Sequence, residues 1–378
     1  MNKVIIIGCG NVGMSYAFSL LNQNTSVNEL VLIDINKERI IGEVADLNHC
    51  LAFSPSKIDI KVGDYTDCRD AKLIVIAAGA NQNPGETRMD LINKNSKIFK
   101  SIITEVMKND FKGYFLVATN PLDIMTYIAY KYSGVDPNKV IGSGTSLDTA
   151  RLRYLIGEKV NINPKSIHTY VIGEHGDSEF VLWSSALIGS EKLDKYLTVD
   201  EMITIESEVR NAAYEIIERK GATYYGIAMC LTRITNAILN NENTIITVSS
   251  YDEKDDIYFS TPTVINKDGA VKKMEVDLNR IEQEKLDNSI NVIKEAIRKI
   301  EWWLKTIYID DHLPIILEEY EKMSYKVLEQ LREKMKKETL KENDYNNKNS
   351  RVRKLPKKMR YYTILENGWR LETNIPLN

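Results

Sequence analysis

Histidine is the side chain best suited to proton transfer near neutral pH, and this chain contains four: His49, His168, His175 and His312. His175 lies within Gly-Glu-His-Gly-Asp at residues 173–177, just after an apolar run that we expect to form a strand. Its small neighbours would leave the imidazole exposed and sharply placed. The ring is therefore a candidate general acid and base, and a purely structural histidine is the alternative.

Two arginines have settings that suit the binding of an anionic substrate. Arg88 ends a loop rich in Gly and Pro, at residues 81–88, that directly follows an expected strand. Arg151 lies three residues after Asp148, a spacing that places both on one face of a helix. A guanidinium binds a carboxylate through two parallel hydrogen bonds. The alternative for Asp148 and Arg151 is a local ion pair.

A glycine-rich turn at the N-terminus predicts a dinucleotide site. An apolar run at residues 3–7 leads into Gly8-Cys9-Gly10-Asn11-Val12-Gly13 and then a helical stretch. Gly8 permits the tight turn, Gly10 lets the backbone approach a pyrophosphate, and Gly13 allows close packing of helix on strand. Asp34 follows 21 residues after Gly13, at the end of the next expected strand. Its carboxylate would bind the ribose and repel a 2′-phosphate, which favours NAD over NADP; a strand-end turn residue is the alternative. We expect the cofactor to be bound by Gly8, Gly10, Val12, Gly13 and Asp34.

Short apolar runs alternate with helical stretches through the first part of the chain. The runs, rich in Val and Ile, cover residues 3–7, 29–34, 58–62, 73–77, 114–118 and 139–142, and helices are expected at 13–22 and 90–108. This alternation predicts an α/β fold with a Rossmann-type doubly wound parallel sheet. The expected NAD-binding domain covers residues 1–142.

The pattern after residue 142 is mixed and predicts a second, α+β substrate domain over residues 143–300. Strands are expected at residues 167–172, 245–249 and 257–265, a long helix at 199–220, and an amphipathic helix at 281–300. Residues 301–378 are expected to form a helical or disordered C-terminal tail.

Bulk composition excludes several classes of protein. The 378 residues are 43% hydrophobic and carry a net charge of −3, so nothing draws the chain as a whole to nucleic acid or to an anionic membrane. Four widely spaced cysteines indicate neither a disulfide framework nor a metal site, and they suit the cytoplasm. We expect no secretory signal, no membrane span and no bound metal.

Five ordered motifs make the chain resemble the L-lactate dehydrogenases, within the lactate/malate dehydrogenase family. Besides the glycine-rich turn they are Gly-Glu-Thr-Arg at 85–88, Ala-Thr-Asn-Pro at 118–121, Leu-Asp-Thr-Ala-Arg-Leu-Arg at 147–153 and Gly-Glu-His-Gly-Asp at 173–177. The similarity covers about residues 1–300 and is strongest to bacterial members. It implies reversible hydride transfer between NADH and pyruvate to give L-lactate.

The resemblance implies a role for each matched residue. His175 corresponds to the proton donor and acceptor, and Asp148 to the carboxylate that orients it. Arg151 corresponds to the arginine that binds the substrate carboxylate, and Arg88 to the arginine on a mobile loop that polarises the carbonyl. Asn120 corresponds to the asparagine beside the nicotinamide and substrate.

Two further matched positions bear on substrate choice. Thr223 corresponds to a residue lining the substrate pocket. At Gln82 the related malate dehydrogenases carry arginine, which pairs the second carboxylate of oxaloacetate. A neutral glutamine there favours a monocarboxylate, because a second carboxylate would be buried unpaired. Malate and branched 2-hydroxy acids remain the alternative substrates, and a non-catalytic NAD-binding module is the alternative from another class.

The resemblance also implies regulation. Arg153 and His168 match a pair that binds fructose 1,6-bisphosphate at a subunit interface, so we expect a homotetramer with this activator; an ordinary surface pair is the alternative. The chain departs from the family pattern at residues 251–258, where a loop looks short, at 188–199, which looks compressed, and at Ser260-Thr261-Pro262. These departures put cooperativity in doubt.

The tail lies outside the resemblance. Residues 301–378 carry 16 Lys and Arg against 13 Asp and Glu, a net +3, whereas the remainder carries 34 against 40, a net −6. Residues 313–340 could form an amphipathic helix, and residues 348–360 hold seven basic residues and no acid. Nucleic acid or an anionic surface is one hypothesis for this run, but we favour a weakly ordered appendage that binds no nucleic acid.

Overall fold

The computed structural model describes residues 2–80, 86–300, 362–363 and 370–371, except for the side chains of Arg88 and of residues 362–363 and 370–371. The chain divides into two compact units, residues 1–301 and 302–378. The predicted helix at 313–340, the basic run at 348–360 and Gln82 lie outside the described residues. In the second unit the described residues are two short antiparallel strands, β15 (Tyr362–Thr363) and β16 (Arg370–Leu371).

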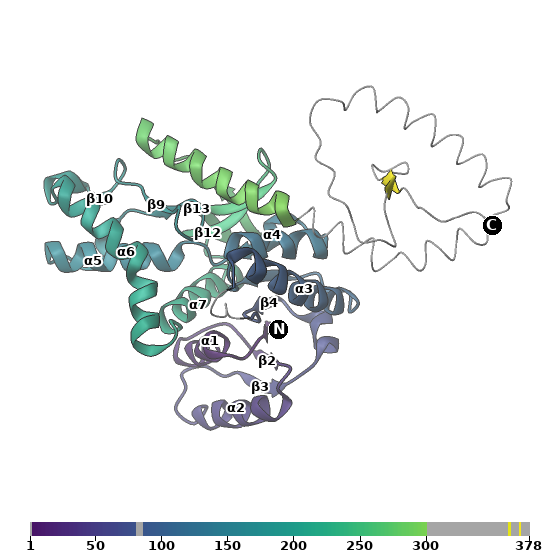
Figure 1. Ribbon diagram of the computed structural model, residues 1–378. Coiled ribbons are helices and arrows are strands. Elements are labelled where there is room, and N and C mark those ends of the chain that lie inside the picture. Colours follow the sequence, from purple (N-terminus) through teal and green to yellow (C-terminus); the bar gives the residue numbers. More distant parts are fainter. Residues whose placement is uncertain (1, 81–85, 301–361, 364–369, 372–378) are drawn as a thin grey trace. The chain divides into compact units, whose positions relative to one another are not determined.

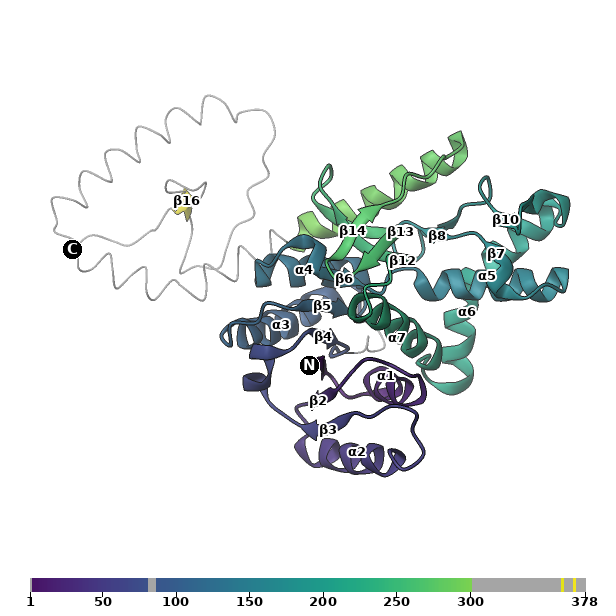
Figure 2. The ribbon, with the colours of Figure 1, turned by 180° about the vertical axis from the view of Figure 1, so that it is seen from behind.

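A nine-stranded sheet in the order β14-β13-β12-β6-β5-β4-β1-β2-β3 organises the first unit (Figures 1 and 2). Its parallel strands are β1 (Lys3–Ile7), β2 (Glu29–Ile33), β3 (Asp59–Val62), β4 (Leu73–Ile76), β5 (Tyr114–Val117) and β6 (Val140–Gly142). The parallel order 3-2-1-4-5-6 is that of dinucleotide-binding folds. The predicted fold class is therefore confirmed.

Helices cover this parallel sheet and bury its Val- and Ile-rich strands. They are α1 (Asn11–Asn22), α2 (Lys37–Cys50), α3 (Arg88–Met107) and α4 (Leu122–Ser133), with the short 3-10 helix η1 at Tyr65–Asp70. β1 and β4 are buried throughout, as strands covered on both faces must be. Thr87 and Asp90 cap α3 reciprocally, so this helix begins directly at Arg88.

The second part of the unit begins with α5 (Ser146–Val160) and continues the same sheet. The antiparallel strands β12 (Thr244–Asp252), β13 (Ile257–Asn266) and β14 (Gly269–Lys273) join it where Ser249 pairs with Gly142. The long α6 (Val199–Lys220) and α7 (Tyr225–Leu239) follow each other, and α7 lies beside α1 in both views (Figures 1 and 2). Residues 280–300 form the last described helix.

Short elements complete the unit. They are η2 (Pro137–Lys139), η3 (Pro164–Ser166), η4 (Leu193–Lys195), β7 (Ile167–His168), β8 (Val171–Ile172), β9 (Phe180–Val181), β10 (Leu187–Ile188) and β11 (Glu191–Lys192). β7 pairs with β10 and belongs to one small sheet, whereas β8 pairs with β9 in another.

Two local predictions need correction. The single strand expected at 167–172 is divided into β7 and β8, because Thr169 between them turns its hydroxyl to the carbonyl of Leu182 and its own carbonyl to Arg153. The short loop expected at 251–258 has narrower bounds in the structure. Tyr251 pairs with Tyr258, and the β12–β13 hairpin turns only over residues 253–256.

Candidate active site

The glycine-rich turn has the close backbone contacts that the sequence predicts. Gly8 has φ +95°, and a Cβ there would lie 2.3 Å from the nitrogen of Ala78; a Cβ on Gly13 would lie 2.1 Å from the carbonyl oxygen of Gly8. A Cβ on Gly10 meets nothing within 4 Å, so the turn is open on that side, beside the N-terminus of α1. An open loop at a helix N-terminus fits a pyrophosphate.

Asp34 lies one residue beyond β2 and holds this turn. Its carboxylate oxygens accept the main-chain N–H of Cys9 at 2.7 Å and that of Asn36 at 2.9 Å. The carboxylate thus stands at the carboxyl end of the sheet, where ligands of such folds bind. The residues present fit a dinucleotide.

His175, Asp148 and Arg151 form a continuous chain of contacts. The Nδ1 of His175 lies 2.8 Å from one oxygen of Asp148, and Arg151 donates to the other oxygen at 2.8 Å. The Asp148 side chain is 3% exposed, that of Arg151 13% and that of His175 25%. The carboxylate of Asp148 is therefore buried, whereas the imidazole of His175 remains partly exposed.

Three elements from distant parts of the sequence hold this chain of contacts together. Asp148 and Arg151 share one face of the first turns of α5, as their spacing predicted. The main-chain N–H of His175 donates to Asp123, at the start of α4, at 2.7 Å. The neighbouring N–H of Glu174 donates to the hydroxyl of Ser289, in the last described helix, at 2.6 Å.

Gly173 is required for this arrangement. Its φ is +98°, and a Cβ there would lie 2.6 Å from the Ser289 hydroxyl oxygen. Any larger residue would push the histidine loop away from the last helix. Close packing against Ser289 thus explains why residue 173 is a glycine, and the sequence alone does not reveal this contact.

The buried charges shift one another's pKa. Burial alone would lower the pKa of His175, but the charge and hydrogen bond of Asp148, helped by Glu179 and Asp123, raise it to about 9. Burial opposes ionisation of Asp148, yet His175 and Arg151 together hold its pKa below the usual range. The histidine is therefore an imidazolium at neutral pH, paired with an ionised aspartate.

Two acids near His175 were not predicted from the sequence. The Glu179 carboxylate lies 3.8 Å from Nδ1 of His175 and is 6% exposed, and burial followed by the charge of Asp148 raises its pKa well above the usual range. Burial raises the pKa of Asp123 to about 6, although Ser249 and the His175 N–H donate to it. Asp123 lies two residues after Pro121, and Glu179 lies four residues after His175. Their closeness to these two motifs was the signal by which the sequence could have revealed them.

The other predicted substrate residues lie at strand and helix ends. Asn120 follows β5 and is exposed, and its carbonyl accepts from the buried Asn95 at 2.9 Å. Asn95 also accepts the main-chain N–H of Ala80 at 2.8 Å, so one side chain joins the loops after β4 and β5. Thr223 is half-buried between α6 and α7.

Arg153 and His168 lie on neighbouring stretches of backbone. Arg153 donates to the carbonyl of Thr169, the residue after His168, at 3.3 Å, and its guanidinium stacks 5.3 Å from the ring centre of Tyr170. His168 is exposed in β7. The structure therefore brings the two predicted effector residues to one part of the surface.

Asp148, His175 and Glu179 also form a group whose ligand atoms lie within 4.8 Å of one another. A divalent metal can use such a set. Here Asp148 accepts from both His175 and Arg151, so a hydrogen-bonded ion pair accounts for the geometry.

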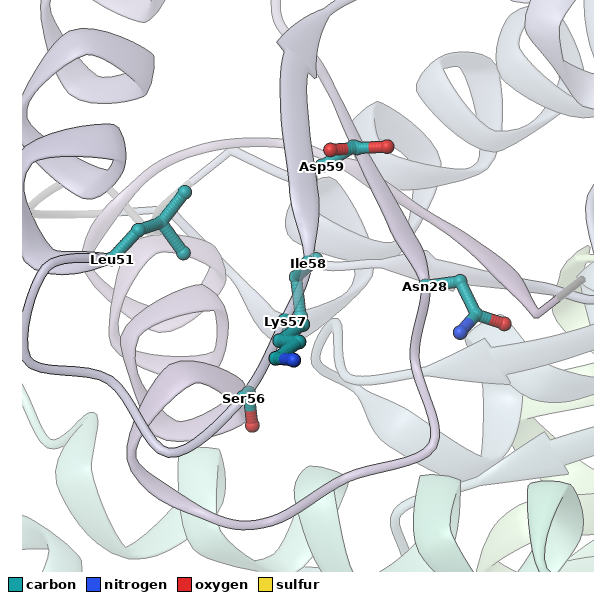
Figure 3. A pocket seen from close by; sticks show the side chains of 6 residues that line it. All are labelled: Asn28, Leu51, Ser56, Lys57, Ile58 and Asp59. Atoms are coloured by element: carbon teal, nitrogen blue, oxygen red, sulfur yellow. The ribbon is translucent and has the colours of Figure 1, made fainter.

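A surface hollow of about 660 Å³ lies elsewhere (Figure 3). Its lining residues are Asn28, Leu51, Ser56, Lys57, Ile58 and Asp59. They cluster where β2 and β3 begin, the end of the sheet opposite to Asp34. Because ligands of open α/β sheets bind at the carboxyl ends of the strands, this hollow is separate from the dinucleotide site.

Comparison with known proteins agrees with the fold and the site. The lactate/malate dehydrogenase NAD binding domain matches residues 2–142, and the alpha/beta C-terminal domain of the same family matches residues 145–302. The chain therefore belongs to the lactate/malate dehydrogenase family. Its activity is that of an NAD-dependent L-lactate dehydrogenase.

Individual relatives support this assignment. An L-lactate dehydrogenase of Bacillus pumilus is 51% identical over 310 residues, covering 79% of this chain and 97% of the relative. The L-lactate dehydrogenase 2 of Bacillus cereus is 48% identical over 310 residues, covering 79% and 98%. The ligand-bound crystal structure of the minor L-lactate dehydrogenase of Enterococcus mundtii has a TM-score of 0.77 at 40% identity, covering 79% and 98%.

No helix in the part of the chain that the structure describes is long and apolar enough to cross a membrane.

Proposed function

We propose that His175 exchanges a proton with the substrate oxygen as this enzyme interconverts pyruvate and L-lactate. The observation that carries the proposal is the 2.8 Å contact of its Nδ1 with the buried, ionised Asp148. That contact fixes the ring and leaves Nε2 for the substrate. It also stabilises the imidazolium that pyruvate reduction needs as an acid.

Arg151 binds the substrate carboxylate in this proposal. A guanidinium has five N–H donors, and Arg151 uses one nitrogen on Asp148. The same carboxylate thus orients both the group that binds the substrate and the group that transfers the proton. Asn120 and Thr223 complete the pocket.

Gln82 and Arg88, which follow β4 in the chain, set specificity and polarise the substrate. We assign Arg88 to the carbonyl oxygen, where positive charge stabilises the developing oxyanion. The neutral side chain of Gln82 favours a monocarboxylate over oxaloacetate. Both assignments depend on the family resemblance.

The dinucleotide would be held by Gly8, Gly10, Val12, Gly13 and Asp34. The N–H groups at the start of α1 would bind its phosphates, and Asp34 would accept from its ribose. Asn120 would lie beside the nicotinamide. When bound, the reduced cofactor supplies the hydride.

The test of the proposal is His175→Ala, with His49→Ala as a matched control, because His49 is an exposed histidine at the end of α2. One positioned acid–base group contributes about 10²–10⁴ in rate, so turnover of pyruvate should fall by that factor while NADH binding is retained. Turnover close to that of the unmodified enzyme would refute the role of His175.

For regulation, we propose that Arg153 and His168 bind fructose 1,6-bisphosphate in a homotetramer. Their common surface, with a fixed guanidinium beside an exposed imidazole, supports this. Where symmetry mates bring several such groups together, a bisphosphate neutralises charges that would otherwise repel. Binding then shifts the population toward the high-affinity state.

Domain roles and location complete the proposal. Residues 1–142 bind the cofactor, residues 143–300 bind the substrate, and residues 301–378 are an appendage without a part in the chemistry. All four cysteines are free thiols, which supports a cytoplasmic enzyme.

A further inference from the structure

Glu179 lies beside the proton-transfer histidine but has no place in the mechanism above. It immediately precedes β9, and its carboxylate lies 3.8 Å from Nδ1 of His175. Its side chain is 6% exposed. A carboxylate so deeply buried needs a nearby positive charge, because water cannot solvate it.

The cations near Glu179 also contact other groups. From α5, Arg151 donates to Asp148 at 2.8 Å. From α6, Arg210 donates to the main-chain oxygen of Glu179 at 3.3 Å and to the carboxylate of Glu206 at 3.4 Å. The Nδ1 of His175 lies 3.8 Å from the Glu179 carboxylate and 2.8 Å from that of Asp148.

Both Asp148 and Glu179 place a carboxylate near Nδ1 of His175, at 2.8 Å and 3.8 Å. Asp148 carries one negative charge but contacts two cations, Arg151 and the imidazolium. Asp123, from α4, accepts the main-chain N–H of His175 and the hydroxyl of Ser249, and its charge also raises the pKa of His175. Burial and the charge of Asp148 raise the pKa of Glu179, and the positive charge of His175 opposes that rise, so an ionised Glu179 would depend on the imidazolium beside it.

We propose that Glu179 is a positioning residue for proton transfer, whose carboxylate supplies the second negative charge that holds the His175 imidazolium. This inference rests on the proposed role of His175. Its consequence is a wider pH range for pyruvate reduction, because the histidine keeps its proton to higher pH. Lactate oxidation, which needs the neutral ring, is displaced toward alkaline pH by the same amount.

The decisive experiment measures the pKa of His175 in the protein without cofactor. Diethyl pyrocarbonate reacts with neutral imidazole, and mass spectrometry of peptides follows each histidine separately across pH. Glu179→Gln should shift the titration of His175 to lower pH by about one unit, since a unit charge at this distance is only partly screened. Glu208→Gln, an exposed glutamate of α6, is the matched control and should leave it unchanged.

Kinetics should agree with this titration. In Glu179→Gln the alkaline limb of kcat/KM for pyruvate should move to lower pH by a similar amount, with the acid plateau retained. A purely structural role would lower the whole profile without moving the limb. Glu179→Leu, a neutral residue of similar size, serves where the glutamine variant folds poorly, and it should give the same shift.

A folded neutral variant in which His175 titrates as in the unmodified protein would overturn the proposal. The proposed function fails separately, if His175→Ala retains turnover. The two results are independent, because the titration does not require catalysis.

Discussion

Asp148 is the residue whose replacement most directly tests the electrostatics of the site. It contacts His175 and Arg151, each at 2.8 Å, and it is the first cause that raises the pKa of His175 from 6.5 to about 9. In Asp148→Asn this cause is lost while burial continues to oppose the charge. The pKa of His175 should therefore return to about 6.5 or lower, a fall of roughly 2.5 units.

The loss of activity should depend on pH in a defined way. Pyruvate reduction uses the protonated ring, and its fraction at pH 7.5 falls from nearly all to about a tenth when the pKa drops to 6.5. The value of kcat/KM should thus fall about tenfold at pH 7.5 and approach roughly 300-fold above pH 9, where both enzymes are mostly deprotonated. Below about pH 6 the protonated fraction recovers, and any remaining loss measures the misorientation of His175 and Arg151.

The assay is the decrease in NADH absorbance with pyruvate, from pH 5 to pH 10, with Glu208→Gln as the charge-matched control. An alkaline limb that stays near pH 9 in Asp148→Asn would refute the assignment of the raised pKa to this carboxylate. A uniform loss at every pH would instead show that Asp148 acts only by positioning.

Three further predictions concern specificity, regulation and the tail. Gln82→Arg should move preference from pyruvate toward oxaloacetate, because the new guanidinium pairs the added carboxylate; an unchanged ratio of the two kcat/KM values would mean that residue 82 does not face the substrate. Fructose 1,6-bisphosphate should lower the apparent KM for pyruvate, and Arg153→Gln should abolish this effect; superimposable pyruvate curves with and without the effector would exclude activation. A chain ending at Ile300 should fold and reduce pyruvate at a rate similar to that of the full chain. A chain ending before Ser289 should lose activity, because the hydroxyl that accepts the Glu174 N–H is gone. Gel filtration and turnover test both truncations, and an inactive chain ending at Ile300 would show that the tail belongs to the enzyme.

The local elements were predictable because their signals are local. The parallel strands are continuous runs of Val and Ile, and β1 begins and ends at the predicted residues. Helix α6 has the predicted bounds because Thr198 with Glu201 caps its start and Gly221, with φ +83°, ends it. The prediction of a single strand at 167–172 was wrong, because the side-chain contact of Thr169 with a distant residue divides it.

The sequence by itself determined the cofactor turn and the types of residue in the site. The turn depends on glycines whose spacing is read directly, and the pairing of Asp148 with Arg151 follows from helical geometry alone. Only the tertiary structure decided what lies around His175. Asp123 and Ser289 come from a helix start and from the last described helix, and folding brings them to the loop that carries His175 and Glu179. The pKa of a buried group depends on charges within a few ångströms in space, whatever their separation along the chain, so no motif could reveal that the histidine is held as an imidazolium.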